Sequence, residues 1–148
     1  MLEFPSDHPV LRTPAIWHPH VERESYAVLL FRREFQLSKP SSKVQLWCSA
    51  SQRFELYLDG VRIARGPSRA DPMRWGVVKE EVKSLSKGRH VLAARVTNLG
   101  DHAGIGQMGG PGFFLLHGSK LDGTDQTIDS DSFGAGVGLE DGDVMEVA

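Results

Sequence analysis

Apolar residues recur at every second position in several stretches of this chain, and this period restricts the fold more than any other feature. In RFELYL (53–58), Phe54, Leu56 and Leu58 alternate with two charged residues and a tyrosine. Successive side chains of a β-strand point to opposite faces, so the pattern predicts a strand with one buried face. No long stretch shows the 3.6-residue period of an amphipathic helix. The sequence therefore predicts an all-β domain.

Further strands are predicted along the chain, separated by turns that contain glycine and proline. They cover residues 26–37, 43–50, 53–65, 76–98 and 111–118. The third stretch contains Asp59-Gly60, which is typical of a tight β-hairpin turn, and the fourth contains a turn that ends at Gly88. Several short strands at this spacing are typical of an antiparallel β-sandwich.

The length of 148 residues suits one domain. We divide the chain into an extended lead-in (1–24), which contains four prolines, a β-sandwich domain (25–128) and a tail (129–148). The tail is acidic and rich in glycine, so we expect it to be poorly ordered.

Cysteine content and charge exclude several classes of protein. Cys48 is the single cysteine, so there is no disulfide framework, and its place on the apolar face of a strand predicts a buried, inert thiol. No signal peptide and no apolar run of about 18 residues is visible, which predicts a soluble, cytoplasmic protein. Residues 1–120 carry 17 basic and 11 acidic groups, a net charge of +6, but these are scattered, so nucleic-acid binding is not predicted.

A glycine motif in the second half of the chain does not indicate a nucleotide site. GIGQMG (104–109) matches the G-x-G-x-x-G pattern of dinucleotide-binding folds. Such a motif must open a helix, and the Gly110-Pro111-Gly112 that follows cannot do so. The stretch is interpreted as a glycine-rich loop.

Two groups of residues could hold a metal, and both have a simpler interpretation. In DSDSFGAGVGLE (129–140) Asp129, Asp131, Gly134 and Glu140 fall on calcium-loop positions, but Phe133 stands where an oxygen ligand is needed. We interpret it as a solvated tail, with calcium as the alternative. The histidines near the N-terminus are assigned capping and packing roles rather than metal binding: His8, His18 and His20.

No pair of carboxylates suits glycoside hydrolysis, which needs two acids facing each other across a cleft. Glu80 and Glu81 are adjacent on a predicted strand and must point to opposite faces. Glu22 and Glu24 lie in the lead-in. We therefore assign no catalytic residue.

The loop RGPSRADPMRW (65–75) carries more large polar and aromatic groups than a turn requires. We expect Arg69 and Asp71 to pair and Trp75 to anchor the exit of the loop. An aromatic surface beside arginine and aspartate suits a sugar, which offers both C–H faces and hydroxyls. A structural clamp is the alternative. The candidate ligand-binding residues are Trp17, Arg69, Asp71, Trp75 and Gln107.

Several of these stretches occur together, in order, in one known family: AIWHP (15–19), FRREFQL (31–37), RFELYLDG (53–60), RGPSRADPMRW (65–75), LSKGRHVLAARVTNLG (85–100) and PGFFL (111–115). Residues 15–118 thereby resemble the N-terminal β-sandwich of bacterial α-L-rhamnosidase-type glycoside hydrolases. The resemblance implies a jelly roll similar to galactose-binding domains. In that family the catalytic acids lie in a helical barrel that this chain does not contain, so it implies an accessory module that cannot hydrolyse glycosides alone.

Two functions remain open at this point. The first is a non-catalytic carbohydrate-binding module, possible ligands being rhamnose-containing glycans. The second is a structural domain that docks against a neighbouring catalytic domain and has no ligand of its own. The exposure of Trp17, Trp47 and Trp75 should separate them, because an aromatic cleft favours sugar and a flat apolar patch favours docking.

Overall fold

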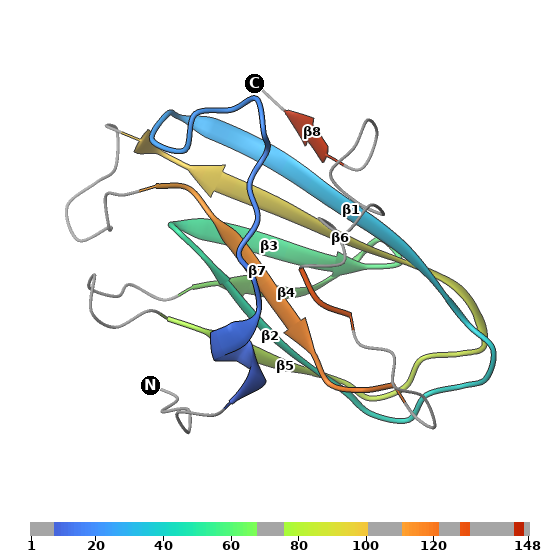
Figure 1. Cartoon of the computed structure of the whole chain (residues 1–148). Coiled ribbons are helices and arrows are strands. Elements are labelled where there is room, and N and C mark those ends of the chain that lie inside the picture. Colours follow the sequence, from blue (N-terminus) through green and yellow to red (C-terminus); the bar gives the residue numbers. More distant parts are fainter. Residues whose placement is uncertain (1–7, 68–75, 101–110, 122–127, 131–143, 147–148) are drawn as a thin grey trace.

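The computed structural model describes residues 8–67, 76–100, 111–121, 128–130 and 144–146. These form two antiparallel sheets that face each other (Figure 1). The elements are a short 3-10 helix η1 (Pro9–Arg12) and the strands β1 (Ala27–Leu37), β2 (Val44–Ala50), β3 (Arg53–Leu58), β4 (Val61–Gly66), β5 (Val78–Val82), β6 (Gly88–Asn98), β7 (Phe114–Gly118) and β8 (Val144–Glu146).

The sheet topology confirms the predicted β-sandwich. One sheet has the strand order β4-β3-β6-β1-β8 and the other has the order β5-β2-β7. Among the described strands, only β3 and β4 are both consecutive in the chain and neighbours in one sheet. Every other connection passes from one sheet to the other, as in the jelly roll that the sequence led us to expect.

The core lies between the sheets and follows the alternation seen in the sequence. Leu29 pairs with Val96, and Phe31 pairs with Ala94, across β1 and β6. All four side chains are buried. From the opposite sheet Phe114 stacks on Phe31, with 5.5 Å between the ring centroids. Large apolar side chains that meet in this way supply most of the stabilisation of a sandwich of this size.

The predicted hairpin turn joins β3 to β4. Asp59 and Gly60 both have positive φ angles, 49° and 83°, which is the backbone of a type I′ turn. Aspartate tolerates this conformation and glycine adopts it freely, so the dipeptide sets the register in which Leu58 faces Val61.

The two ends of the chain also contact the sandwich. Ile16, in the lead-in, forms a β-bridge with Phe114. In the predicted tail, Ser130 is fully buried and its hydroxyl donates a hydrogen bond of 2.6 Å to the carbonyl of Pro14. Strand β8 extends the five-stranded sheet beyond β1. The described residues of the tail are thus part of the folded unit, while residues 131–143 lie outside the described ranges.

Candidate functional site

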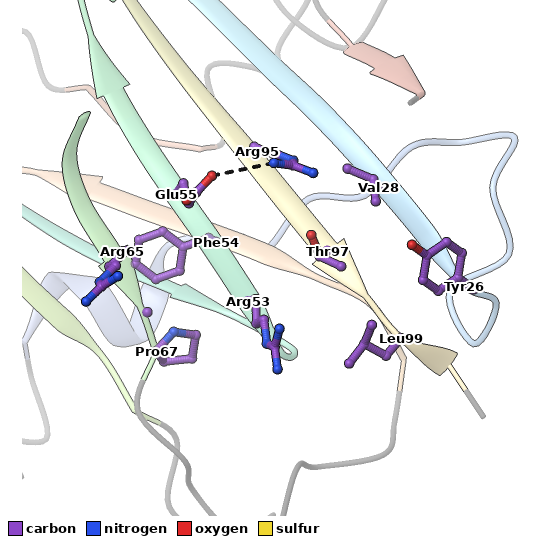
Figure 2. Close-up of a pocket in the computed structure, with 11 residues that line it drawn as sticks. Tyr26, Val28, Arg53, Phe54, Glu55, Arg65, Pro67, Arg95, Thr97 and Leu99 are labelled. Atoms are coloured by element: carbon purple, nitrogen blue, oxygen red, sulfur yellow. Dashed lines mark ion pairs between the residues drawn. The ribbon is translucent and has the colours of Figure 1, made fainter. Parts of the chain in front are cut away.

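A pocket of about 770 Å³ opens on the outer face of the five-stranded sheet, away from the core (Figure 2). It lies at the end of the sheet where β1 and β3 begin and where β4 and β6 end. Its described lining comes from four strands and from residues next to their ends: Tyr26, Val28, Arg53, Phe54, Glu55, Arg65, Gly66, Pro67, Arg95, Thr97 and Leu99.

Strand alternation places the polar side chains in this pocket. Because Phe54 is buried in the core, its neighbours Arg53 and Glu55 must point outward. The register then brings outward residues of adjacent strands together: Arg53 lies opposite Thr97, and Glu55 lies opposite Arg95. The pocket is therefore a direct product of sheet pairing.

Glu55 is the centre of a polar network at one edge of the pocket. Its carboxylate accepts a hydrogen bond of 3.1 Å from Arg62, lies 3.8 Å from Arg95 and accepts a hydrogen bond of 3.0 Å from the Tyr57 hydroxyl. That last hydrogen bond raises the pKa of Tyr57, because the phenol must keep its proton in order to donate it. The network fixes the Glu55 side chain, and Figure 2 shows its ion pair with Arg95.

Positive charge dominates the lining that the structure describes. Within it, three arginines, Arg53, Arg65 and Arg95, stand beside one carboxylate, that of Glu55. All three arginines are exposed, and the side chain of Arg95 keeps 53% of its surface open to solvent. A guanidinium group offers only hydrogen-bond donors, so the site can bind acceptor-rich groups of a ligand.

Apolar surface completes the pocket. The ring of Tyr26 is 55% exposed, and Figure 2 shows it on the β1 side of the pocket, while Arg53 lies between Pro67 and Leu99. An exposed aromatic ring beside charged donors can pack against the C–H face of a sugar while the donors bind its oxygens. The arrangement is suited to ligand binding.

Of the residues predicted from sequence to bind ligand, four cannot be placed. Arg69, Asp71, Trp75 and Gln107 lie outside the described residues, and so does the expected pairing of Arg69 with Asp71. Their role stays a prediction. The chain does enter segment 68–75 directly from Pro67, which lines the pocket.

The fifth predicted residue, Trp17, lies elsewhere. Its indole N–H donates a hydrogen bond of 3.1 Å to the carbonyl of Val21, and its ring packs so closely on Gly112 that an added Cβ would come within 2.6 Å of it. Trp17 is half-buried against the core and is not among the residues that line the pocket. This geometry is that of a packing residue in the lead-in.

Trp47 is also less exposed than the sequence suggested. It points outward from the three-stranded sheet, but it is only 8% exposed. His117 stacks on it with 5.5 Å between ring centroids, His8 meets its edge at 5.0 Å, and Lys79 lies 5.8 Å from its centroid. The sequence correctly predicted that Trp47 lies on the outer face of its strand, but the residues that cover it come from distant parts of the chain.

The described pocket residues were not predicted from the sequence to form a site. The available signal was the recurrence of arginine at outward positions of neighbouring strands, in Arg53 on β3 and Arg95 on β6. Reading that signal requires the pairing of β3 with β6, which lies more than thirty residues further along the chain. Alternation shows which side chains of a strand share a face, but it does not show which other strand lies beside that strand in the sheet.

The described residues contain no group of three or more histidine, cysteine, aspartate or glutamate side chains that could hold a metal ion. His8 accepts a hydrogen bond from the backbone of Val10 and caps η1, as expected. Asp129, the first residue of the calcium-like stretch, accepts a hydrogen bond of 3.0 Å from the backbone of Gly118 and lies 2.9 Å from His117. The other positions of that stretch, from residue 131 onward, lie outside the described ranges.

Cys48 is buried, as its strand position predicts. Desolvation, with a smaller contribution from Glu80, raises the pKa of the thiol, so it stays protonated and unreactive. No helix within the described ranges has the length and apolar character needed to cross a membrane.

Comparison with known proteins gives a fold but not a family. No family model matches the sequence, and no curated protein matches it. Among solved structures, the GH78 family rhamnosidase of Bacillus sp. GL1 superimposes with a TM-score of 0.66 and 21% identity, over 78% of this chain and 12% of the rhamnosidase chain. The α-L-rhamnosidase of Streptomyces avermitilis, solved with L-rhamnose, matches with a TM-score of 0.59 and 18% identity, over 92% of this chain and 12% of its own.

A lectin has the same fold. The Pleurotus ostreatus lectin, solved in complex with GalNAc, matches with a TM-score of 0.64 and 19% identity, over 86% of this chain and 35% of the lectin chain. The resemblance to a rhamnosidase β-sandwich is thus confirmed at the level of the fold. This chain spans only a small part of each of these proteins.

Proposed function

We propose that this chain is a non-catalytic, carbohydrate-binding accessory domain, and that the outer-face pocket is its binding site. The observation that carries the proposal is the combination of an exposed tyrosine ring with arginine side chains in a pocket of about 770 Å³. That volume is large enough for one or two sugar rings, since small-ligand pockets typically measure about 300–1,000 Å³. The C–H face of a sugar would lie against Tyr26, and its oxygens would accept hydrogen bonds from the arginines.

The proteins that share the fold support a role in carbohydrate recognition. One is a lectin solved with GalNAc, and two are rhamnosidases, one of them solved with L-rhamnose. Because the matched region makes up 12% of each of these two rhamnosidase chains, the proposed setting is a small domain beside a catalytic one. Rhamnose-containing glycans are accordingly among the ligands to be tested.

A glycan panel tests this proposal. The purified chain is titrated with neutral and acidic oligosaccharides, including rhamnose-containing ones, and binding is measured by calorimetry. Tyr26→Ala should weaken binding by roughly tenfold, because loss of one aromatic contact costs about 1 kcal/mol or more. Leu11→Ala is the matched control, because Leu11 is also largely exposed, at 60%, but does not line the pocket.

The proposal fails if no glycan binds to a chain that is shown to be folded by circular dichroism. It also fails if a glycan binds and the two variants weaken that binding equally. The second result would place a glycan site elsewhere on the surface.

A second candidate function is docking against a neighbouring catalytic domain without a ligand. The small share of the rhamnosidase chains that this fold occupies supports it. Absence of glycan binding, together with a stable complex between this chain and a separately produced catalytic domain of such an enzyme, would favour docking.

A further inference from the structure

We infer that the outer-face pocket selects acidic saccharides, those that carry a carboxylate on the sugar ring, over neutral ones. This inference rests on the proposed function, and it concerns which class of glycan the pocket recognises. It follows from three features of the described lining: its balance of charge, the positions of its arginines and the small number of side chains in it that can accept a hydrogen bond.

The carboxylate of Glu55 does not neutralise the pocket. Arg62, which is not among the lining residues, donates a hydrogen bond of 3.1 Å to it, and the Tyr57 hydroxyl donates another of 3.0 Å. Arg95 is held more loosely, since its nearest contact with Glu55 is 3.8 Å. The single negative charge of Glu55 is thus shared with Arg62, Tyr57 and Arg95, and among the described lining residues Arg65 and Arg95 leave an excess of positive charge.

Sheet register places the arginines on adjacent strands. Arg65 on β4 and Arg95 on β6 both lie directly opposite Glu55, one on each side of it. Arg53 stands two residues before Glu55 on the same face of β3, a spacing of about 7 Å along the strand. Three arginines on three adjacent strands thus line the same pocket, and Figure 2 shows their side chains at separate places along it.

Arg65 is the arginine best placed to receive a ligand. Its side chain is exposed, and within the part of the chain that the structure describes it has no ion-pair partner. A guanidinium group binds a carboxylate through two parallel hydrogen bonds, and such charged bonds are about twice as strong as neutral ones.

The lining supplies few acceptors for the hydroxyl groups of a neutral sugar. Among the described lining side chains, only Glu55, Thr97 and the Tyr26 hydroxyl can accept a hydrogen bond, while the three arginines can only donate. The hydroxyl oxygens of a neutral sugar can accept hydrogen bonds from the arginines, but each hydroxyl group also brings a donor, and the described lining has only these three side chains to accept it. A carboxylate on the ring brings no donor and accepts stronger, charged hydrogen bonds from the arginines, while the ring can still place its C–H face on Tyr26 and Leu99.

Two ligands that differ only in charge test the inference. The probes are tri-galacturonic acid and its methyl ester, which keeps the sugar rings but removes the negative charges. The acid should bind at least about tenfold more tightly than the ester, as expected for one charged hydrogen-bonded pair. Binding of the acid should also weaken as the NaCl concentration rises, because the arginines are exposed and screened by salt.

Substitutions of single arginines test whether the preference for the acid comes from the pocket. Arg65→Gln should weaken binding of the acid by about tenfold and leave binding of the ester nearly unchanged. Arg12→Gln is the matched control, because Arg12 lies in η1 and outside the pocket. The signals of arginine Nε–H groups in NMR spectra provide a second readout, and those of Arg53, Arg65 and Arg95 should shift when the acid is added.

The outcomes separate the two proposals. If the ester binds as tightly as the acid and Tyr26→Ala weakens both, the preference for acidic sugars is wrong and the carbohydrate-binding function stands. If the acid binds but Arg65→Gln and Arg12→Gln weaken it equally, the attraction belongs to the overall charge of the chain and the inference is also wrong. If no member of the glycan panel binds to the folded chain, both proposals fall.

Discussion

His90 is buried, with 6% exposure, and both of its ring nitrogens contact acceptors. Nδ1 lies 2.7 Å from the carboxylate of Asp59, and Nε2 lies 2.8 Å from the carbonyl oxygen of Ser86. A neutral imidazole has one N–H group and can donate to only one of them. The doubly protonated ring satisfies both, so this site favours the charged form of His90.

The shifts in the pKa values of His90 and Asp59 agree with this geometry. Desolvation acts to lower the pKa of His90, but the hydrogen bonds to Ser86 and Asp59 outweigh it and raise the pKa. For Asp59 desolvation acts to raise the pKa, but the hydrogen bonds from His90 and from the Val91 backbone outweigh it and lower the pKa. Stabilisation from His90 is complete below its unfolded pKa of about 6.5 and is lost as the pH rises through the higher folded value. Stabilisation from Asp59 is present above about pH 3.9 and is lost as the pH falls through the lower folded value.

The pair should therefore contribute most to stability between about pH 4 and pH 6.5. Asp59→Asn removes the charge but tolerates the positive φ of the turn and can still accept the hydrogen bond from Val91. It should lower the melting temperature more at about pH 5 than at about pH 8. Glu34→Gln is the control. Glu34 pairs with Arg89 and Arg32, which lower its pKa, so this variant should change the melting temperature by the same amount at about pH 5 and at about pH 8.

Equal losses for Asp59→Asn at the two pH values would contradict the proposed protonation of His90. The Glu34 control then shows whether pH alters the baseline stability of the fold.

At the scale of elements, the strands could be predicted because their signal is local. The predicted stretches 26–37 and 43–50 agree with β1 and β2 to within one residue at each end, and Asp59-Gly60 forms the predicted turn. The covering of Trp47 could not be predicted, because it depends on His8 and His117, which lie far away in the sequence. The arginine pocket was missed for the same reason, since it exists only once β3, β4 and β6 are paired.

The start of the tail offers a test at this scale. Composition predicts that residues 129–148 contribute little to stability, but the hydroxyl of Ser130 is buried and bonds to the Pro14 carbonyl in the lead-in. Ser130→Ala should cost about 1 kcal/mol, which corresponds to a fall of about 2–4 °C in the melting temperature for a domain of this size. Ser25→Ala is the control, because the Ser25 hydroxyl makes a comparable hydrogen bond to Glu22 at an exposed site. If both variants melt like the wild type, this contact between tail and lead-in does not stabilise the fold.

At the scale of the whole molecule, the composition of the described pocket lining bears on hydrolysis. Its described lining contains one carboxylate, Glu55, whereas glycoside hydrolysis uses two acids, about 5–9.5 Å apart. The purified chain should therefore show no turnover of an aryl α-L-rhamnoside. Glu55→Gln is the diagnostic variant: turnover that persists through repurification and disappears in this variant would show that the pocket is catalytic.

The crossing connections between the sheets have a consequence for synthesis. β1 pairs along its whole length with β6, so Leu29 meets its partner Val96 only after the intervening chain has been made. At about 5–20 residues per second, a ribosome needs roughly 3–13 s for that stretch. During this time β1 lacks its backbone hydrogen bonds to β6 and its apolar face is uncovered. Among the described strands, only β3 and β4 pair as neighbours in the chain and can form from local contacts. The nascent chain thus exposes an aggregation-prone strand for seconds, and its yield in cells should depend on chaperones that bind extended apolar segments.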